Sequence, residues 1–98
     1  MDQDTINKVQ DAYVPHIGLN LASAIDDEIA RSYKHDEVFA SLHEAYAVIL
    51  EELDEVWDIT RLKRKNRDAD KLREEFIQIA AMAIKAIQSM DNFVGGNI

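Results

Sequence analysis

The sequence predicts an all-α protein, an antiparallel helical bundle with three main helices of which the first is kinked. Proline and glycine are scarce, with one and three copies among 98 residues, and apolar residues recur at intervals of three and four. Those intervals are typical of amphipathic helices. We expect a single domain over residues 1–98, with its core completed by oligomerisation, because so few helices rarely enclose a core alone.

The first helical segment is expected over residues 4–33. Pro15 should kink or break it, since proline has no backbone N–H and clashes with the preceding turn. The residues beside this bend are Val14 and His16. After the bend, one apolar stripe is formed by Leu21, Ala22, Ile25 and Ile29. Residues 34–40 are expected to connect this segment to the next helix.

The second helix has a clear start signal at Ser41. Ser41 and Glu44 have the spacing of a capping box, in which the serine hydroxyl accepts a hydrogen bond from a backbone N–H and the glutamate reaches back. The helix is expected to continue to residue 63 or 64. A polar turn follows at residues 65–70.

The third helix is expected over residues 71–90, with Asp68 or Asp70 as its N-cap. Two long helices joined by a short turn must lie antiparallel. The midpoint of the second helix should therefore lie near the midpoint of the third.

Each of these two helices places a carboxylate in the middle of an apolar stripe. On a wheel of ~100° per residue, Glu52 is central on the second helix and Glu55 lies at the edge of the same arc. The aliphatic neighbours of Glu52 are Ala45, Val48, Ile49, Val56 and Ile59. On the third helix, Glu75 is central and Gln78 lies at the edge. The neighbours of Glu75 are Leu72, Ile79, Met82, Ala86 and Met90.

A carboxylate in such a place must be neutralised or paired, because burying an isolated charge is costly. Mg²⁺ is one good solution, since it prefers carboxylate oxygens and retains waters for a phosphate-bearing substrate. The candidate metal ligands are Glu52, Glu55, Glu75 and Gln78. The alternative is that the acidic residues form a solvated face or pair with the cationic side chains of residues 61–73.

The same residues resemble the motif of a known family. Residues 51–55, Glu-Glu-Leu-Asp-Glu, and residues 75–78, Glu-Phe-Ile-Gln, resemble the MazG-like all-α nucleoside triphosphate pyrophosphohydrolases. The pattern of that family is Glu-Glu-x-x-Glu, a variable gap, then Glu-x-x-Asp, and the gap here is the 19 residues between Glu55 and Glu75. The likeness is strongest over residues 41–90.

The resemblance implies a house-cleaning enzyme that hydrolyses a nucleoside triphosphate (NTP or dNTP) to a monophosphate and pyrophosphate. It implies Mg²⁺ or Mn²⁺ as cofactor, and a homodimer or homotetramer with sites at subunit interfaces. Glu52, Glu55 and Glu75 would be metal ligands. Glu51 and Glu52 would be catalytic, with Glu51 holding a second ion or orienting the attacking water.

Gln78 departs from the family pattern, which has Asp at this position. Its amide oxygen can ligate a metal, but the negative charge is lost, so Mg²⁺ affinity should fall. This motivates a second hypothesis, a catalytically weakened module that binds nucleotide or a protein partner without efficient turnover. A third is a structural helical dimer, whose carboxylates pair with residues 61–73 of another copy.

Three further residues are candidates for contact with substrate. Residues 61–73 hold seven of the eleven cationic side chains, and of these Arg64 and Lys71 are candidates for phosphate contact. Trp57 lies on a second apolar strip of its helix, with Tyr46 and Leu50. That strip predicts a helix–helix or subunit contact, with base stacking by Trp57 as the alternative.

Composition excludes several classes of function. The net charge of −8 disfavours nucleic acid as a partner, because phosphate backbones are bound mainly by Lys and Arg. Without cysteine there is neither a disulfide nor a thiolate zinc site. The first residues lack the features of a signal peptide, and the longest uncharged run, residues 12–25, is too short to span a membrane. We expect a cytoplasmic protein with no membrane partner.

Overall fold

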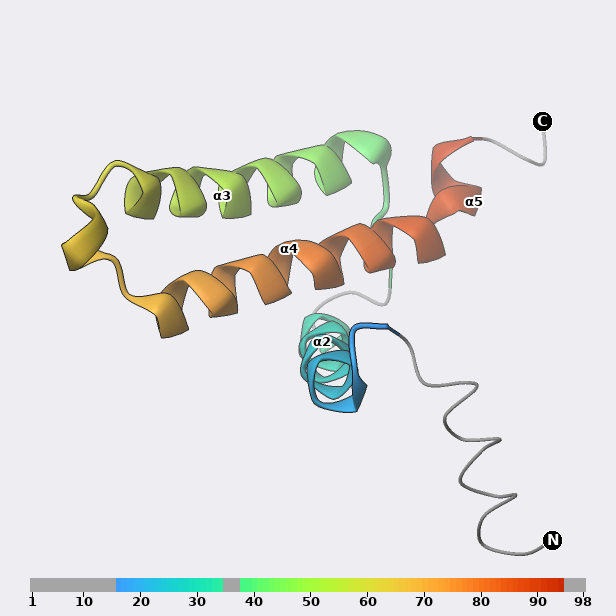
Figure 1. Ribbon diagram of the computed structural model, residues 1–98. Coiled ribbons are helices and arrows are strands. Elements are labelled where there is room, and N and C mark those ends of the chain that lie inside the picture. The colour runs from blue at the N-terminus through green and yellow to red at the C-terminus, as the bar shows by residue number, and fades with distance from the viewer. Residues whose placement is uncertain (1–15, 35–37, 95–98) are drawn as a thin grey trace, which may run out of the picture.

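The computed structural model describes residues 16–34 and 38–94. Within them every element of regular secondary structure is a helix, and there is no strand. The elements are α2 (Leu19–Ser32), α3 (Leu42–Thr60), the 3-10 turn η1 (Arg64–Asn66), α4 (Ala69–Gln88) and α5 (Met90–Phe93) (Figure 1). The all-α class is therefore confirmed. The predicted helix before residue 16, and the kink at Pro15, lie outside the described residues.

The helices α3 and α4 form a hairpin, in which the two helices lie antiparallel (Figure 1). The helix α2 is viewed along its own axis in the same picture, so it crosses the hairpin at a steep angle. Both α2 and α3 pack against α4. A bundle of three antiparallel helices is thus not confirmed, and the described part is a hairpin with a crossing helix.

The start of α3 follows the predicted capping chemistry with one difference. The Ser41 hydroxyl accepts a hydrogen bond from the Glu44 N–H at 3.1 Å. The Glu44 carboxylate accepts from the N–H of Ala40, also at 3.1 Å, rather than from that of the N-cap residue. One of the N-terminal donors of the helix, the Glu44 N–H, is therefore satisfied by a side chain, and the bond to Ala40 fixes the residue before the N-cap.

The helix α3 ends at Thr60, three or four residues before the predicted end. The guanidinium of Arg67 donates a hydrogen bond to the Thr60 carbonyl at 2.8 Å, which satisfies one of the carbonyls that a helix end leaves free. Asp68 then caps α4, where its carboxylate accepts from the backbone N–H groups of Asp70 and Lys71. Of the two predicted N-cap candidates, Asp68 and Asp70, the structure has Asp68.

At its far end α4 stops at Gln88 instead of continuing to residue 90. The hydroxyl of Ser89 donates to the Lys85 carbonyl at 2.7 Å and accepts from the Phe39 N–H at 2.9 Å. The side-chain amide of Asn92, on α5, donates to the Phe39 carbonyl at 2.9 Å. These bonds attach the connection before α3 to the junction of α4 and α5.

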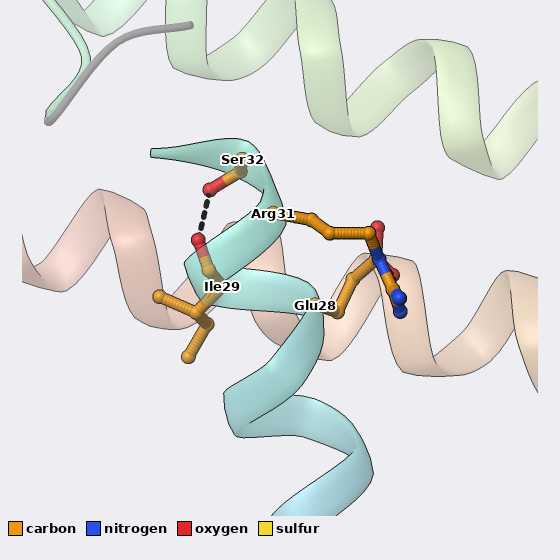
Figure 2. Close-up of polar contacts among 4 residues, drawn as sticks. All are labelled: Glu28, Ile29, Arg31 and Ser32. Carbon is orange, nitrogen blue, oxygen red and sulfur yellow. Dashed lines mark hydrogen bonds and ion pairs between the residues drawn. The ribbon is translucent and has the colours of Figure 1, made fainter. Parts of the chain in front are cut away.

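The core of the described residues is small. The buried apolar residues are Ile25, Ile29, Phe39, Ala45, Ala81 and Met82. The α2 stripe was predicted correctly in its two central members, Ile25 and Ile29. Near the end of that helix, Ser32 donates to the Ile29 carbonyl, and Arg31 pairs with Glu28 on the side away from the Ile29 side chain (Figure 2). No helix among residues 16–34 and 38–94 is long and apolar enough to cross a bilayer.

Candidate metal centre

Three carboxylates meet between α3 and α4. Glu52 and Glu55 come from α3 and Glu75 comes from α4, and one oxygen of each lies within 4.8 Å of the others. The spacing of i, i+3 places the two α3 carboxylates on one face. The hairpin then brings Glu75 to the same level, so three of the four predicted ligands are brought together.

The three carboxylates differ in their access to solvent. Glu75 is 1% exposed, Glu52 is half-buried, and Glu55 is exposed. Among the described residues, the Oε2 atoms of Glu52 and Glu75 are buried without any hydrogen-bond partner. A buried acceptor without a partner costs stability, and a carboxylate costs more than a neutral group. Within residues 16–34 and 38–94, no group donates a hydrogen bond to these two oxygens.

Lys71 is the cation that reaches the cluster. Its Nζ lies 3.0 Å from Oε1 of Glu75, one helical turn away on α4, and its side chain remains 55% exposed. This pairing agrees with the alternative interpretation, in which the carboxylates pair with cationic side chains of residues 61–73, and Lys71 was also a candidate for phosphate contact. The signal was present in the sequence, because Lys71 and Glu75 have the i, i+4 spacing of a helical ion pair.

The proximity of the three acids changes their protonation. Burial, together with the neighbouring carboxylates of Glu55 and Glu75, raises the pKa of Glu52 to about 7. A hydrogen bond with Glu75 raises the pKa of Glu55. That same bond, with help from Lys71, lowers the pKa of Glu75. Without a cation, the cluster therefore retains a proton close to neutral pH.

The fourth predicted ligand, Gln78, is half-buried on α4. Antiparallel helices that bring Glu55 beside Glu75 place Gln78, one turn further along α4, at the level of Glu52, one turn back along α3. Gln78 thus lies at the correct level to complete the cluster, with an amide in place of a charge.

The remaining candidates lie further out. Glu51 is exposed on α3 and is not one of the three clustered carboxylates. Arg64 is exposed in η1, at the tip of the hairpin (Figure 1). Trp57 is 59% exposed, and Tyr46 and Leu50 of the same strip are also exposed. The strip is therefore unpacked within the described chain.

The chemistry of the donor set fits a hard divalent cation. Three carboxylates supply only oxygen ligands, which Mg²⁺ prefers, and the unpartnered Glu75 oxygen has no other described use. Comparisons with protein-family models, curated protein sequences and solved structures gave no match. Arguments about function therefore rest on the residues and geometry of this cluster.

Proposed function

We propose that this protein is a Mg²⁺-dependent nucleoside triphosphate pyrophosphohydrolase of the MazG-like type, with Mn²⁺ as an alternative cofactor. One observation carries the proposal: the buried, unpartnered oxygen of Glu75 lies in a cluster of three carboxylates from two helices. The α3 residues of that cluster belong to the Glu-Glu-x-x-Glu sequence of residues 51–55. Buried carboxylates with perturbed protonation are typical of sites that bind a ligand, which supports the proposal.

The three carboxylates would have different roles in metal binding, because they differ in burial. Glu75 is held rigidly in the core and would act as a fixed ligand, while the exposed Glu55 faces the side from which substrate arrives. Glu52 would release its proton when a cation binds, because the pKa of this carboxyl lies near neutral pH. Mg²⁺ held there would neutralise phosphate charge and lower the pKa of an attacking water.

Two neighbouring residues would assist. Glu51 lies about 100° from Glu52 around the helix axis, and is free to orient a water from the exposed side. Lys71 has an exposed stem, so its ammonium can leave Glu75 and reach a substrate phosphate. Lys71 would then exchange one anionic partner for another during the cycle.

Self-association is the second part of the proposal. Only six apolar residues of the described chain are buried, whereas thirteen large apolar side chains are exposed. Such exposure in a chain of 98 residues is what a homodimer or homotetramer would cover. The cytoplasm remains the expected location.

The test is pyrophosphate release from a panel of standard and modified ribo- and deoxyribonucleoside triphosphates, with Mg²⁺ and with Mn²⁺. We expect turnover of at least one nucleotide, and a metal-dependent rise in melting temperature that Glu52→Gln abolishes. The matched control is Glu74→Gln, which removes the same charge from an exposed position beside Glu75. A flat panel without a metal-induced shift would reject the proposal.

A second function is favoured by Gln78, which supplies an amide where the family pattern has a carboxylate. In that case the chain would be a weakened family member that binds nucleotide, or a protein partner, without efficient turnover. The Gln78→Asp variant separates the two. If the native chain binds Mg²⁺ and nucleotide silently and the variant gains turnover, the binding function holds. If the native chain already turns over and the variant changes the rate only a few-fold, the enzyme holds.

A further inference from the structure

An apolar stripe runs along the solvent side of α3. Its five members are Leu42, Tyr46, Leu50, Leu53 and Trp57, and each is between 41% and 67% exposed. On a wheel of ~100° per residue they fall within an arc of about 80°, beside the arc that packs on α4. At about 1.5 Å per residue, the stripe is roughly 22 Å long.

Four of the five members are spaced symmetrically along the helix. Leu42 and Trp57 lie at equal distances from a point between Ile49 and Leu50, and so do Tyr46 and Leu53. Two copies of α3 packed antiparallel about that point would place Leu42 opposite Trp57 and Tyr46 opposite Leu53, and the two copies of Leu50 would lie next to each other beside the axis. This is the self-complementarity that a two-fold symmetric interface requires.

The surface also provides a place for the largest side chain of the stripe. A hollow of about 330 Å³ is lined by Leu42, His43 and Tyr46 at the start of α3. In the antiparallel arrangement, Trp57 of the second copy lies at the level of Leu42, over this hollow. An aromatic side chain in a pocket is typical of the residues that dominate binding energy, and the two-fold axis produces the contact twice.

Area and charge agree with the same partner. The five side chains expose roughly 600 Å², most of what a standard interface buries at about 800 Å² per partner. The acidic residues flanking the stripe, Asp54 and Asp58, would face levels that carry Ala45 and Ser41 instead of acids. His43 of the second copy would lie between the levels of the two aspartates, which favours the pairing.

We infer that this stripe is the interface of a two-fold symmetric homodimer, in which α3 packs antiparallel on α3 of a second copy with Leu50 beside the axis. The inference rests on the self-association in the proposed function and is independent of its chemistry. The carboxylate cluster lies between α3 and α4 of one chain, so metal binding and this interface can fail separately.

Cysteine cross-linking tests the arrangement cleanly, because the native chain has no cysteine. Under mild oxidation, Leu50→Cys should form a disulfide dimer at least ten times faster than Leu53→Cys alone. A mixture of Leu53→Cys and Tyr46→Cys chains should cross-link to the mixed dimer. Equal rates for L50C and L53C would overturn the antiparallel register, because a parallel pair would bring positions 53 together as readily as positions 50.

Sedimentation supplies the second test. The native chain should have a mass twice that of the 11.2 kDa monomer, and Leu50→Glu should weaken the dimer at least 100-fold by placing two carboxylates at the axis. The control is Leu19→Glu, at an α2 residue that is 66% exposed and lies off the stripe. Circular dichroism checks that L50E is folded, and the Mg²⁺-induced thermal shift on the same samples reports the metal centre separately. A native monomer, or a dimer that L50E leaves intact, would overturn the interface.

Discussion

The two ends of α4 bury polar side chains in opposite ways. Near its C-terminal end, the Ser89 hydroxyl has both a donor and an acceptor partner, and the Lys85 ammonium lies 4.8 Å and 5.5 Å from the ring centres of Phe39 and Tyr33. Towards its N-terminal end, Glu75 is equally buried, but one of its oxygens has no described partner. The first end is satisfied by the fold itself, and the second is not.

This difference separates structural burial from functional burial. A buried hydroxyl with two good hydrogen bonds positions the loop before α3 and needs nothing else. A buried carboxylate among two more carboxylates destabilises the fold unless a proton or a cation balances its charge, and this requirement is the basis of the proposed metal site. Variants that make the two ends of α4 behave alike test this difference.

The largest effect is expected from Glu75→Gln. The amide removes a fixed ligand, so pyrophosphate release should fall on the order of 100-fold or more and the Mg²⁺-induced thermal shift should vanish. In EDTA the variant should melt no lower than the native chain, because the new N–H₂ can donate to the unpartnered Glu52 oxygen. Calorimetry with Mg²⁺ and a melting curve in EDTA measure the two effects.

The neighbouring variant Glu74→Gln is the control, since it removes a charge from an exposed position. It should keep both turnover and the metal response. If E75Q also keeps its metal response, the carboxylate is structural and the contrast between the two ends of α4 disappears.

The next effect concerns the satisfied end. Ser89→Ala leaves the buried Phe39 N–H without its acceptor, so the free energy of unfolding should fall by about 2 kcal/mol. The Mg²⁺-induced shift should be unchanged. Ser32→Ala is the control, because among the described residues the Ser32 hydroxyl bonds the Ile29 carbonyl of its own helix (Figure 2), and its loss should cost less than about 0.5 kcal/mol. If both variants lost the same free energy of unfolding, the hydrogen bonds of Ser89 would contribute no more than an ordinary helix-terminal bond.

The pH dependence follows from Glu52. Its pKa is raised from an ordinary value of 4.5 to about 7 in the cation-free fold, so the folded state binds more protons than the unfolded state between these values. Stability measured in EDTA should therefore be greatest below pH 4.5 as far as this group contributes, and decrease as pH rises to 7.

A cation must displace the same proton. Apparent Mg²⁺ affinity should rise about tenfold between pH 6 and pH 8, with close to one proton released per metal at the lower pH. Titration calorimetry in two buffers of different ionisation enthalpy counts that proton. An affinity independent of pH would mean that Glu52 is already ionised in the cation-free protein.

Local features of the fold were accessible from the sequence because they depend on short-range chemistry. Ser41 was identified as a cap from residue type and spacing, and Asp68 was one of two candidates for the next cap. The helical period alone placed Glu52 and Glu75 on facing apolar stripes. Nothing comparable encodes the crossing of α2 over the hairpin. That angle depends on how side chains of α2 and α4 interlock, which single-helix patterns do not specify.

The sequence also did not specify which groups the side chains of Arg67 and Lys71 contact. The end of α3 at Thr60 depends on Arg67, a side chain seven residues further along that folds back onto the helix end. Lys71 had two plausible anionic partners, a substrate phosphate or Glu75, and its sequence spacing is compatible with both. Only the placement of Nζ at 3.0 Å from Glu75 identifies its partner in the cation-free chain.

The smallest effect is expected from Lys71→Met, which keeps the apolar stem and removes the ammonium that pairs with Glu75. If Lys71 occupies the position of a cation until one binds, its loss should tighten Mg²⁺ binding about threefold, a modest gain because the half-exposed ammonium is partly screened by solvent. Lys65→Met, which removes the same charge from exposed η1, should leave the affinity unchanged. In the proposed reaction K71M should also raise KM, because the released ammonium would no longer meet a phosphate. Weaker Mg²⁺ binding in K71M than in K65M would show that Lys71 supports the metal centre instead of competing with the metal. Lys71 would then stabilise the N-terminal part of α4, as Ser89 stabilises its C-terminal end.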